Sequence, residues 1–158
     1  MTIPQGPEIG APAPAFDLPA TGGSAKLADH AGKAVVLYFY PKDDTPGCTT
    51  EAQDFTAAAA DFAAAGAVVI GVSKDPLKSH EKFAAKRGLT VILGSDETGT
   101  TCEDYGVWVE KSMYGKTYMG VERATFLIDG AGIVRGVWRK VKVKGHAAEV
   151  LEAAKALG

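Results

Sequence analysis

The sequence lacks asparagine altogether and contains only two cysteines, Cys48 and Cys102. The absence of asparagine excludes N-linked glycosylation, and two cysteines are too few for the disulfide framework of a small secreted protein. Residues 1–14 have neither the basic start nor the apolar stretch of a secretory signal. We therefore expect a cytoplasmic protein whose cysteines serve catalysis or packing rather than a structural disulfide.

Long apolar runs and a strong net charge are also missing. The apolar stretch at 34–40 is far shorter than the ~20 residues of a membrane helix, and the net charge is only −2. Neither nucleic acid nor a membrane is therefore expected as a partner. A chain of 158 residues, 46% of them hydrophobic and 23% charged, suits one compact domain over residues 1–158.

Strand and helix signals alternate along the chain. After an extended leader over 1–13, we expect strands at 15–18, 24–27, 34–40, 67–72, 89–93, 124–128 and 133–138, and helices at 49–65, 76–87, 96–105 and 145–157. The apolar segment around Met113 and Tyr118 is expected to be a loop. This order predicts an α/β three-layer sandwich of thioredoxin-like arrangement, with a βαβ half followed by a ββα half.

One segment carries recognisable chemistry. Cys48 follows the apolar run at 34–40 and falls in, or one residue before, the first turn of the next predicted helix. Unpaired N–H groups and the positive helix end favour a thiolate there, and the thiolate is the nucleophilic form. Thr45 is close enough to reach the sulfur or a bound oxygen, and Pro41 can shield the sulfur from water. A lone cysteine could equally be a small buried hydrophobe, but its position between strand and helix favours catalysis.

The spacing P-x-x-x-T-x-x-C from Pro41 to Cys48 resembles the active-site signature of the peroxiredoxin family. The longer string YFYPKDDTPGCTTEA resembles its Q-type branch, also called bacterioferritin comigratory protein. Segments 71–89, 105–129 and 138–146 resemble the same branch. The resemblance implies a peroxiredoxin fold, which is the thioredoxin-like sandwich with an N-terminal β-hairpin extension. It also implies a thiol-dependent peroxidase that reduces hydrogen peroxide and organic hydroperoxides, without a metal or organic cofactor.

The resemblance also implies a role for each matching residue. Cys48 matches the peroxidatic cysteine, which becomes a sulfenic acid. Thr45 matches the hydroxyl that orients the peroxide, Pro41 matches the shielding proline, and Gly47 joins them in binding the substrate. Arg123 matches the arginine that converges on the thiolate from another strand; on spacing alone it would be interpreted as a surface charge at a strand end.

The sequence departs from this branch in its second cysteine. Many members carry a resolving cysteine five residues after the first, where this chain has Gln53, and others carry it on the next helix, where residues 82–87 contain none. We therefore expect a one-cysteine mechanism in which an external thiol (thioredoxin, glutaredoxin or glutathione) reduces the sulfenic acid. Cys102 is expected to be structural, with a resolving or intermolecular thiol as the alternative. A monomer is favoured over a weak dimer.

Two other functions stay open at this point. A thioredoxin-like disulfide oxidoreductase would need a C-x-x-C pair, whereas this chain has T-x-x-C. A redox-regulated holdase would need neither Thr45 nor Arg123 beside the cysteine. His30, His80 and His146 show no metal-ligand spacing with the cysteines, and we expect surface or capping roles for them.

Overall fold

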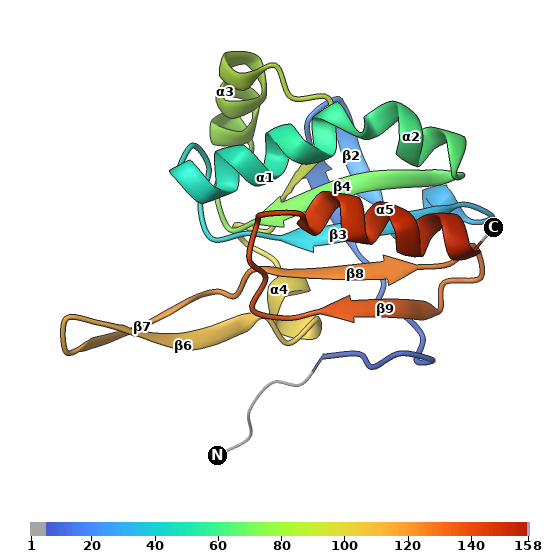
Figure 1. Ribbon diagram of the computed structural model, residues 1–158. Helices are drawn as coiled ribbons and strands as arrows, with labels where there is room; N and C mark the ends of the chain where they lie inside the picture. Colours follow the sequence, from blue (N-terminus) through green and yellow to red (C-terminus); the bar gives the residue numbers. More distant parts are fainter. Residues whose placement is uncertain (1–5, 158) are drawn as a thin grey trace.

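Strands and helices alternate through most of the chain, of which the computed structural model describes residues 6–157 (Figure 1). The strands are β1 (Asp17–Ala20), β2 (Gly23–Lys26), β3 (Ala34–Phe39), β4 (Ala67–Ser73), β5 (Ile92–Ser95), β6 (Trp108–Met113), β7 (Lys116–Val121), β8 (Ala124–Ile128) and β9 (Val134–Trp138). The helices are α1 (Pro46–Ala57), α2 (Ala59–Ala64), α3 (Leu77–Arg87), α4 (Thr101–Asp104) and α5 (His146–Leu157), with a 3-10 turn at Leu27–His30. Part of the predicted leader, residues 1–5, lies outside the described residues.

The central sheet has seven strands in the order β2-β1-β5-β4-β3-β8-β9. Strands β3, β4 and β5 are parallel, and β8 pairs antiparallel with β3. All six residues of β3 are buried, as a continuous run of branched and aromatic residues predicts for a strand covered on both faces. Parallel strands end at the same edge of a sheet, so the loops after β3, β4 and β5 lie together there.

Each face of the sheet has its own apolar core. Alternate residues of β3 belong to different cores because side chains point to opposite faces along a strand. Val36 and Tyr38 pack with α1, α2, α3 and α5, whereas Val35 and Leu37 pack with β1, α4 and the segment after it. Figure 1 shows α1, α2 and α5 across one face and α4 on the other. Among the described residues, no helix has the length and apolar character needed to cross a bilayer.

Several helix boundaries differ from those predicted. The helix expected at 49–65 begins earlier, at Pro46, because proline suits the first helical position, and it is interrupted at Ala58, whose φ and ψ are −93° and 3°. Helix α3 ends at Gly88, as predicted, in a left-handed conformation with φ 64°. The helix expected at 96–105 is reduced to the single turn α4, since Asp96 instead caps it through its side chain.

The prediction of a loop around Met113 and Tyr118 is wrong. Strands β6 and β7 form a two-stranded hairpin that projects from the body of the molecule (Figure 1). Its turn residues, Tyr114 and Gly115, have φ of 53° and 78°, which is the geometry of a tight hairpin turn. The hairpin delivers the chain back to the sheet immediately before Arg123.

Candidate active site

Cys48 is the third residue of α1, within the first turn, as predicted. Thr45 precedes the helix in an extended conformation and Pro46 opens it. The sulfur therefore lies among backbone N–H groups that have no partner within the helix, where negative charge is stabilised. Cys48 is only 2% exposed and packs in the core beneath α1.

Thr45 and Pro41 are the two residues of the loop before Cys48 that were predicted to act beside it. The Thr45 hydroxyl donates to the Lys42 carbonyl at 2.9 Å. Because this bond uses the single hydroxyl proton of Thr45, its oxygen can act toward a bound peroxide only as a hydrogen-bond acceptor. Pro41 is exposed in the bend that follows β3, and its shielding of the sulfur stays a prediction.

Arg123 reaches the sulfur from the link between β7 and β8. Its Nη2 donates to Cys48 Sγ at 3.3 Å, and its Nη1 donates to Glu51 Oε1 at 2.7 Å. Burial opposes its charge, but the negative groups of Glu51 and Cys48 outweigh that effect, so the pKa of the Arg123 guanidinium is raised. A Cβ at Gly47 would lie 3.2 Å from Nη2, so glycine at this position leaves room for the guanidinium.

Glu51 is a site residue that the sequence analysis missed. Its side chain is 1% exposed and holds Arg123 in the orientation that reaches Cys48. Burial raises the pKa of Glu51 from 4.5 to about 7, although Arg123 acts in the opposite direction. The spacing offered a signal, since residues three apart in a helix share a face and Glu51 is three residues after Cys48.

A second cation lies near the site. Lys111, on β6, is half-buried; burial lowers its pKa, the charge of Arg123 lowers it further, and Cys48 acts in the opposite direction. Strand β6 therefore adds positive charge around the sulfur.

Cys102 lies in the other core, on the opposite face of the sheet from Cys48. Both cysteines are free thiols. Cys102 is fully buried, and burial together with the Asp96 carboxylate raises the pKa of its thiol. This environment favours a structural role over a resolving one, because a reactive cysteine needs access and a stabilised thiolate.

The expectation that the three histidines lie at the surface is wrong for two of them. His80 is 0% exposed and His146 is 5% exposed. His146 Nε2 lies 2.7 Å from the Thr125 hydroxyl, and burial lowers its pKa. His80 belongs to a cluster of titratable side chains beside the loop that follows β3.

Comparisons with known proteins show the family of this chain. The AhpC/TSA family matches residues 9–137. The chain is a Q-type peroxiredoxin of that family. This peroxiredoxin is 51% identical to peroxiredoxin Bcp of Xanthomonas campestris, over 92% of each chain. It is 50% identical to peroxiredoxin Bcp of Bacillus subtilis, over 98% of this chain and 97% of that one.

Solved structures give the same result. The Xylella fastidiosa PrxQ structure superposes with a TM-score of 0.90 at 41% identity, covering 96% of this chain and 97% of that one. The Xanthomonas campestris bacterioferritin comigratory protein, whose structures concern its alkyl peroxide reduction activity, has a TM-score of 0.85 at 50% identity, with 90% of this chain and 91% of that one covered. The thioredoxin-like fold is confirmed, and the protein is a thiol-dependent peroxidase that uses a peroxide and a thiol reductant.

Proposed function

We propose that this peroxiredoxin reduces hydrogen peroxide and organic hydroperoxides by a one-cysteine mechanism centred on Cys48. The observation that carries the proposal is the 3.3 Å contact between Arg123 Nη2 and Cys48 Sγ at the start of α1. A guanidinium keeps its charge at all working pH values and offers several fixed donors. It therefore stabilises the thiolate before the reaction and the departing oxygen during it.

The first half-reaction is a displacement at oxygen. The Cys48 thiolate attacks the nearer oxygen of R–O–O–H, an S–O bond forms and the O–O bond breaks. The leaving RO⁻ takes up a proton and departs as water or an alcohol, while Cys48 becomes a sulfenic acid. Thr45 accepts a hydrogen bond from the peroxide, Arg123 donates to its oxygens, and Gly47 and Pro41 shape the binding site.

The second half-reaction uses two external thiols. One thiol attacks the Cys48 sulfenic acid, which releases water and leaves a mixed disulfide. A second thiol then attacks the outer sulfur of this mixed disulfide, which breaks the S–S bond and releases reduced Cys48 together with an external disulfide. Position 53 is glutamine and residues 82–87 contain no cysteine, which supports this route. The burial of Cys102 in the core on the opposite face of the sheet from Cys48 supports it as well. Thioredoxin, glutaredoxin and glutathione are the candidate reductants of a cytoplasmic, monomeric enzyme.

The proposed roles are tested by rapid mixing of the reduced protein with one equivalent of peroxide. Replacing Cys48 with serine should abolish oxidation, and Arg123→Ala should slow it by about 100-fold or more, as loss of one charge-stabilising donor does in other enzymes. The matched control is Arg135→Ala, because Arg135 is exposed and pairs with Asp129 instead; this variant should react at the unaltered rate. Oxidation of Arg123→Ala at the unaltered rate would contradict the proposed role of the guanidinium.

The one-cysteine route is tested on the oxidised protein. Cys48 sulfenic acid should persist, detectable by mass spectrometry, until a reductant is added, and Cys102→Ala should not change the rate of its reduction. Adding each of the three candidate thiols separately identifies the reductant by rate. Rapid loss of sulfenic acid without added thiol, together with a Cys48–Cys102 disulfide, would refute the one-cysteine route.

A further inference from the structure

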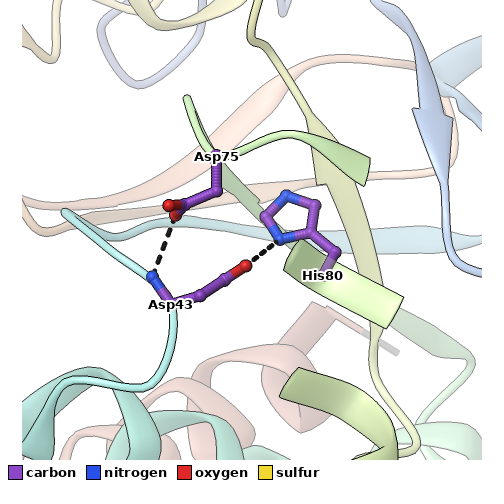
Figure 2. Close-up of side chains that lie close together, drawn as sticks. All are labelled: Asp43, Asp75 and His80. Atoms are coloured by element: carbon purple, nitrogen blue, oxygen red, sulfur yellow. Dashed lines mark hydrogen bonds and ion pairs between the residues drawn. The ribbon is translucent and has the colours of Figure 1, made fainter. Parts of the chain in front are cut away.

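A cluster of three titratable side chains lies beside the active-site loop, which we define as residues 40–45 between β3 and α1. Figure 2 shows Asp43 from this loop, Asp75 from the segment after β4 and His80 from α3. His80 Nδ1 lies 2.7 Å from Asp43 Oδ2, and the Asp43 backbone N–H donates to Asp75 Oδ2 at 2.9 Å. The side chains of His80 and Asp43 are 0% and 4% exposed.

Histidine and two carboxylates within 4.8 Å of one another are a set that can bind a metal ion. Here, however, proton donors already point at the carboxylates. Asp75 Oδ2 accepts from the Asp43 N–H and the Ser73 hydroxyl, and Asp43 accepts from the hydroxyls of Tyr40 and Ser79. The hydrogens of these donors carry partial positive charge and would repel a metal cation at the same carboxylate oxygens. The cluster is therefore better suited to hold a proton than a metal ion.

The hydrogen-bond partners fix where that proton lies. His80 Nε2 is 2.9 Å from the Gly94 carbonyl oxygen, and a carbonyl can only accept, so Nε2 carries a hydrogen. A bare Nδ1 would then point its lone pair at the Asp43 carboxylate from 2.7 Å, which is repulsive. Asp43 also accepts from two hydroxyls, which suits an ionised carboxylate. A hydrogen therefore lies between His80 Nδ1 and Asp43 Oδ2, and the two hydroxyls that donate to Asp43 favour its place on the nitrogen.

We propose that His80, held as an imidazolium, is a positioning residue for the chemistry of Cys48. Its charged hydrogen bond fixes Asp43, and Asp43 fixes the active-site loop that carries Thr45 and leads into the first turn of α1. This inference rests on the proposed function of Cys48. It goes beyond that function by assigning control of the loop to a buried proton.

A second set of ion pairs joins the same loop to α3 but is weaker. Asp44 pairs with Lys86 at 2.7 Å and with Arg87 at 2.8 Å. These side chains are one-third to two-thirds exposed, and exposed ion pairs contribute little. A buried pair, in contrast, leaves an uncompensated charge when one partner is removed. The Asp43–His80 pair is therefore the contact that governs the loop.

The cluster also separates the two half-reactions. Cys48 is 2% exposed, so an external thiol reaches its sulfenic acid only when the loop moves. Weakening the Asp43–His80 pair should slow oxidation, which needs the assembled site, without slowing reduction by the thiol.

The titratable groups facing His80 are Asp43, Asp75 and Tyr40, and none of them is in contact with Cys48 through a hydrogen bond.

The protonation of His80 is tested first by ¹⁵N NMR of the imidazole rings in the reduced full-length protein at about pH 7. Correlations between ring nitrogens and carbon-bound hydrogens distinguish an imidazolium from the two neutral tautomers. We expect His80 to be an imidazolium, whereas His146 in the same spectrum should be neutral because burial lowers its pKa. A neutral His80 would overturn the proposal whether or not the protein reduces peroxide.

The positioning role is tested with two isosteric substitutions. His80→Asn keeps a donor near the Nδ1 position, facing Asp43, whereas His80→Gln keeps one near the Nε2 position, facing Gly94. If Asp43 is the anchor, Gln should slow the oxidation of Cys48 by about tenfold or more, and Asn should restore much of the rate. Reduction of the sulfenic acid should not slow in either variant. Equal losses in the two variants would overturn the proposal, because they would indicate packing alone.

Asp43→Asn provides the reciprocal test. The variant removes the carboxylate and places an amide donor opposite Nδ1, so His80 should become a neutral Nε2–H tautomer and the oxidation of Cys48 should slow. The control is Lys82→Ala, an exposed change on the same helix, which should alter neither the spectrum nor the rate. If the unaltered protein fails to oxidise rapidly, the proposed function fails, while an imidazolium at His80 would still stand as a separate result.

Discussion

Replacing Glu51 with glutamine should change how the stability of the protein depends on pH. Glu51 is 1% exposed, and burial raises its pKa from 4.5 to about 7. Since the folded-state value is the higher one, folding favours the protonated carboxyl. This contribution is complete below the unfolded value and is lost as the pH rises through about 7. Glutamine is a neutral isostere and removes the dependence.

The size of the effect follows from the same two values. A rise from 4.5 to about 7 corresponds to about 3 kcal/mol, since each pKa unit is worth ~1.4 kcal/mol. Between about pH 5 and about pH 8 the unaltered protein should therefore lose about 2 to 3 kcal/mol of unfolding free energy relative to Glu51→Gln. Titrating groups that do not interact with Glu51 contribute equally to both proteins, so their contributions cancel in the comparison.

Urea unfolding of both proteins at the two pH values, with the cysteines kept reduced, measures this difference. Glu152→Gln is the control, because it makes the same change at a side chain that is exposed on α5. Parallel pH profiles for Glu51→Gln and the unaltered protein would refute the reasoning, since they would show that burial does not raise the pKa of Glu51.

Three further changes test other parts of the site. Gly47→Ala places a Cβ 3.2 Å from the Arg123 nitrogen that donates to Cys48; it should slow peroxide oxidation by roughly tenfold with little change in urea unfolding. Cys102→Ala should leave the oxidation rate unaltered and lower the unfolding free energy by about 1 kcal/mol, and a slower rate would contradict its structural role. Burial lowers the pKa of His146 below 6.5, so its neutral form contributes stability above that value that is lost as the pH falls through the lowered pKa. His146→Gln should therefore lose less stability than the unaltered protein on acidification, and an equal loss would contradict this.

The central strands could be predicted because their sequence pattern depends on burial alone. The run at β3 is apolar throughout and is buried on both faces, and β8 has the predicted limits. Strands β6 and β7 were missed because most of their side chains are exposed, so apolar and polar residues do not alternate along them as they do in a strand with one buried face. Their turn is Tyr114-Gly115 rather than the Asn-Gly or Asp-Gly pair that marks a tight hairpin.

The site was predicted in part for a similar reason. Cys48 and Thr45 belong to one local motif, and Arg123 was identified by resemblance to a family rather than by spacing. Glu51 and His80 are buried by contacts between distant segments, with Arg123 72 positions away and Asp43 37 positions away. A polar residue in a helix is ordinarily exposed, so only its alignment with a buried neighbour could have indicated otherwise. His80 shares a face of α3 with the buried Phe83, which was such an indication.

The two sulfurs lie on opposite faces of the sheet, and in the proposed route this separation determines how long the oxidised enzyme lasts. In the proposed one-cysteine route, the sulfenic acid does not close into an internal disulfide and remains an electrophile until a reductant arrives. In that interval a second peroxide molecule can carry the same sulfur to sulfinic acid, which ordinary thiols do not reverse. The ratio of reductant to peroxide, rather than the speed of the first step, should then decide whether each enzyme molecule survives a burst of oxidant.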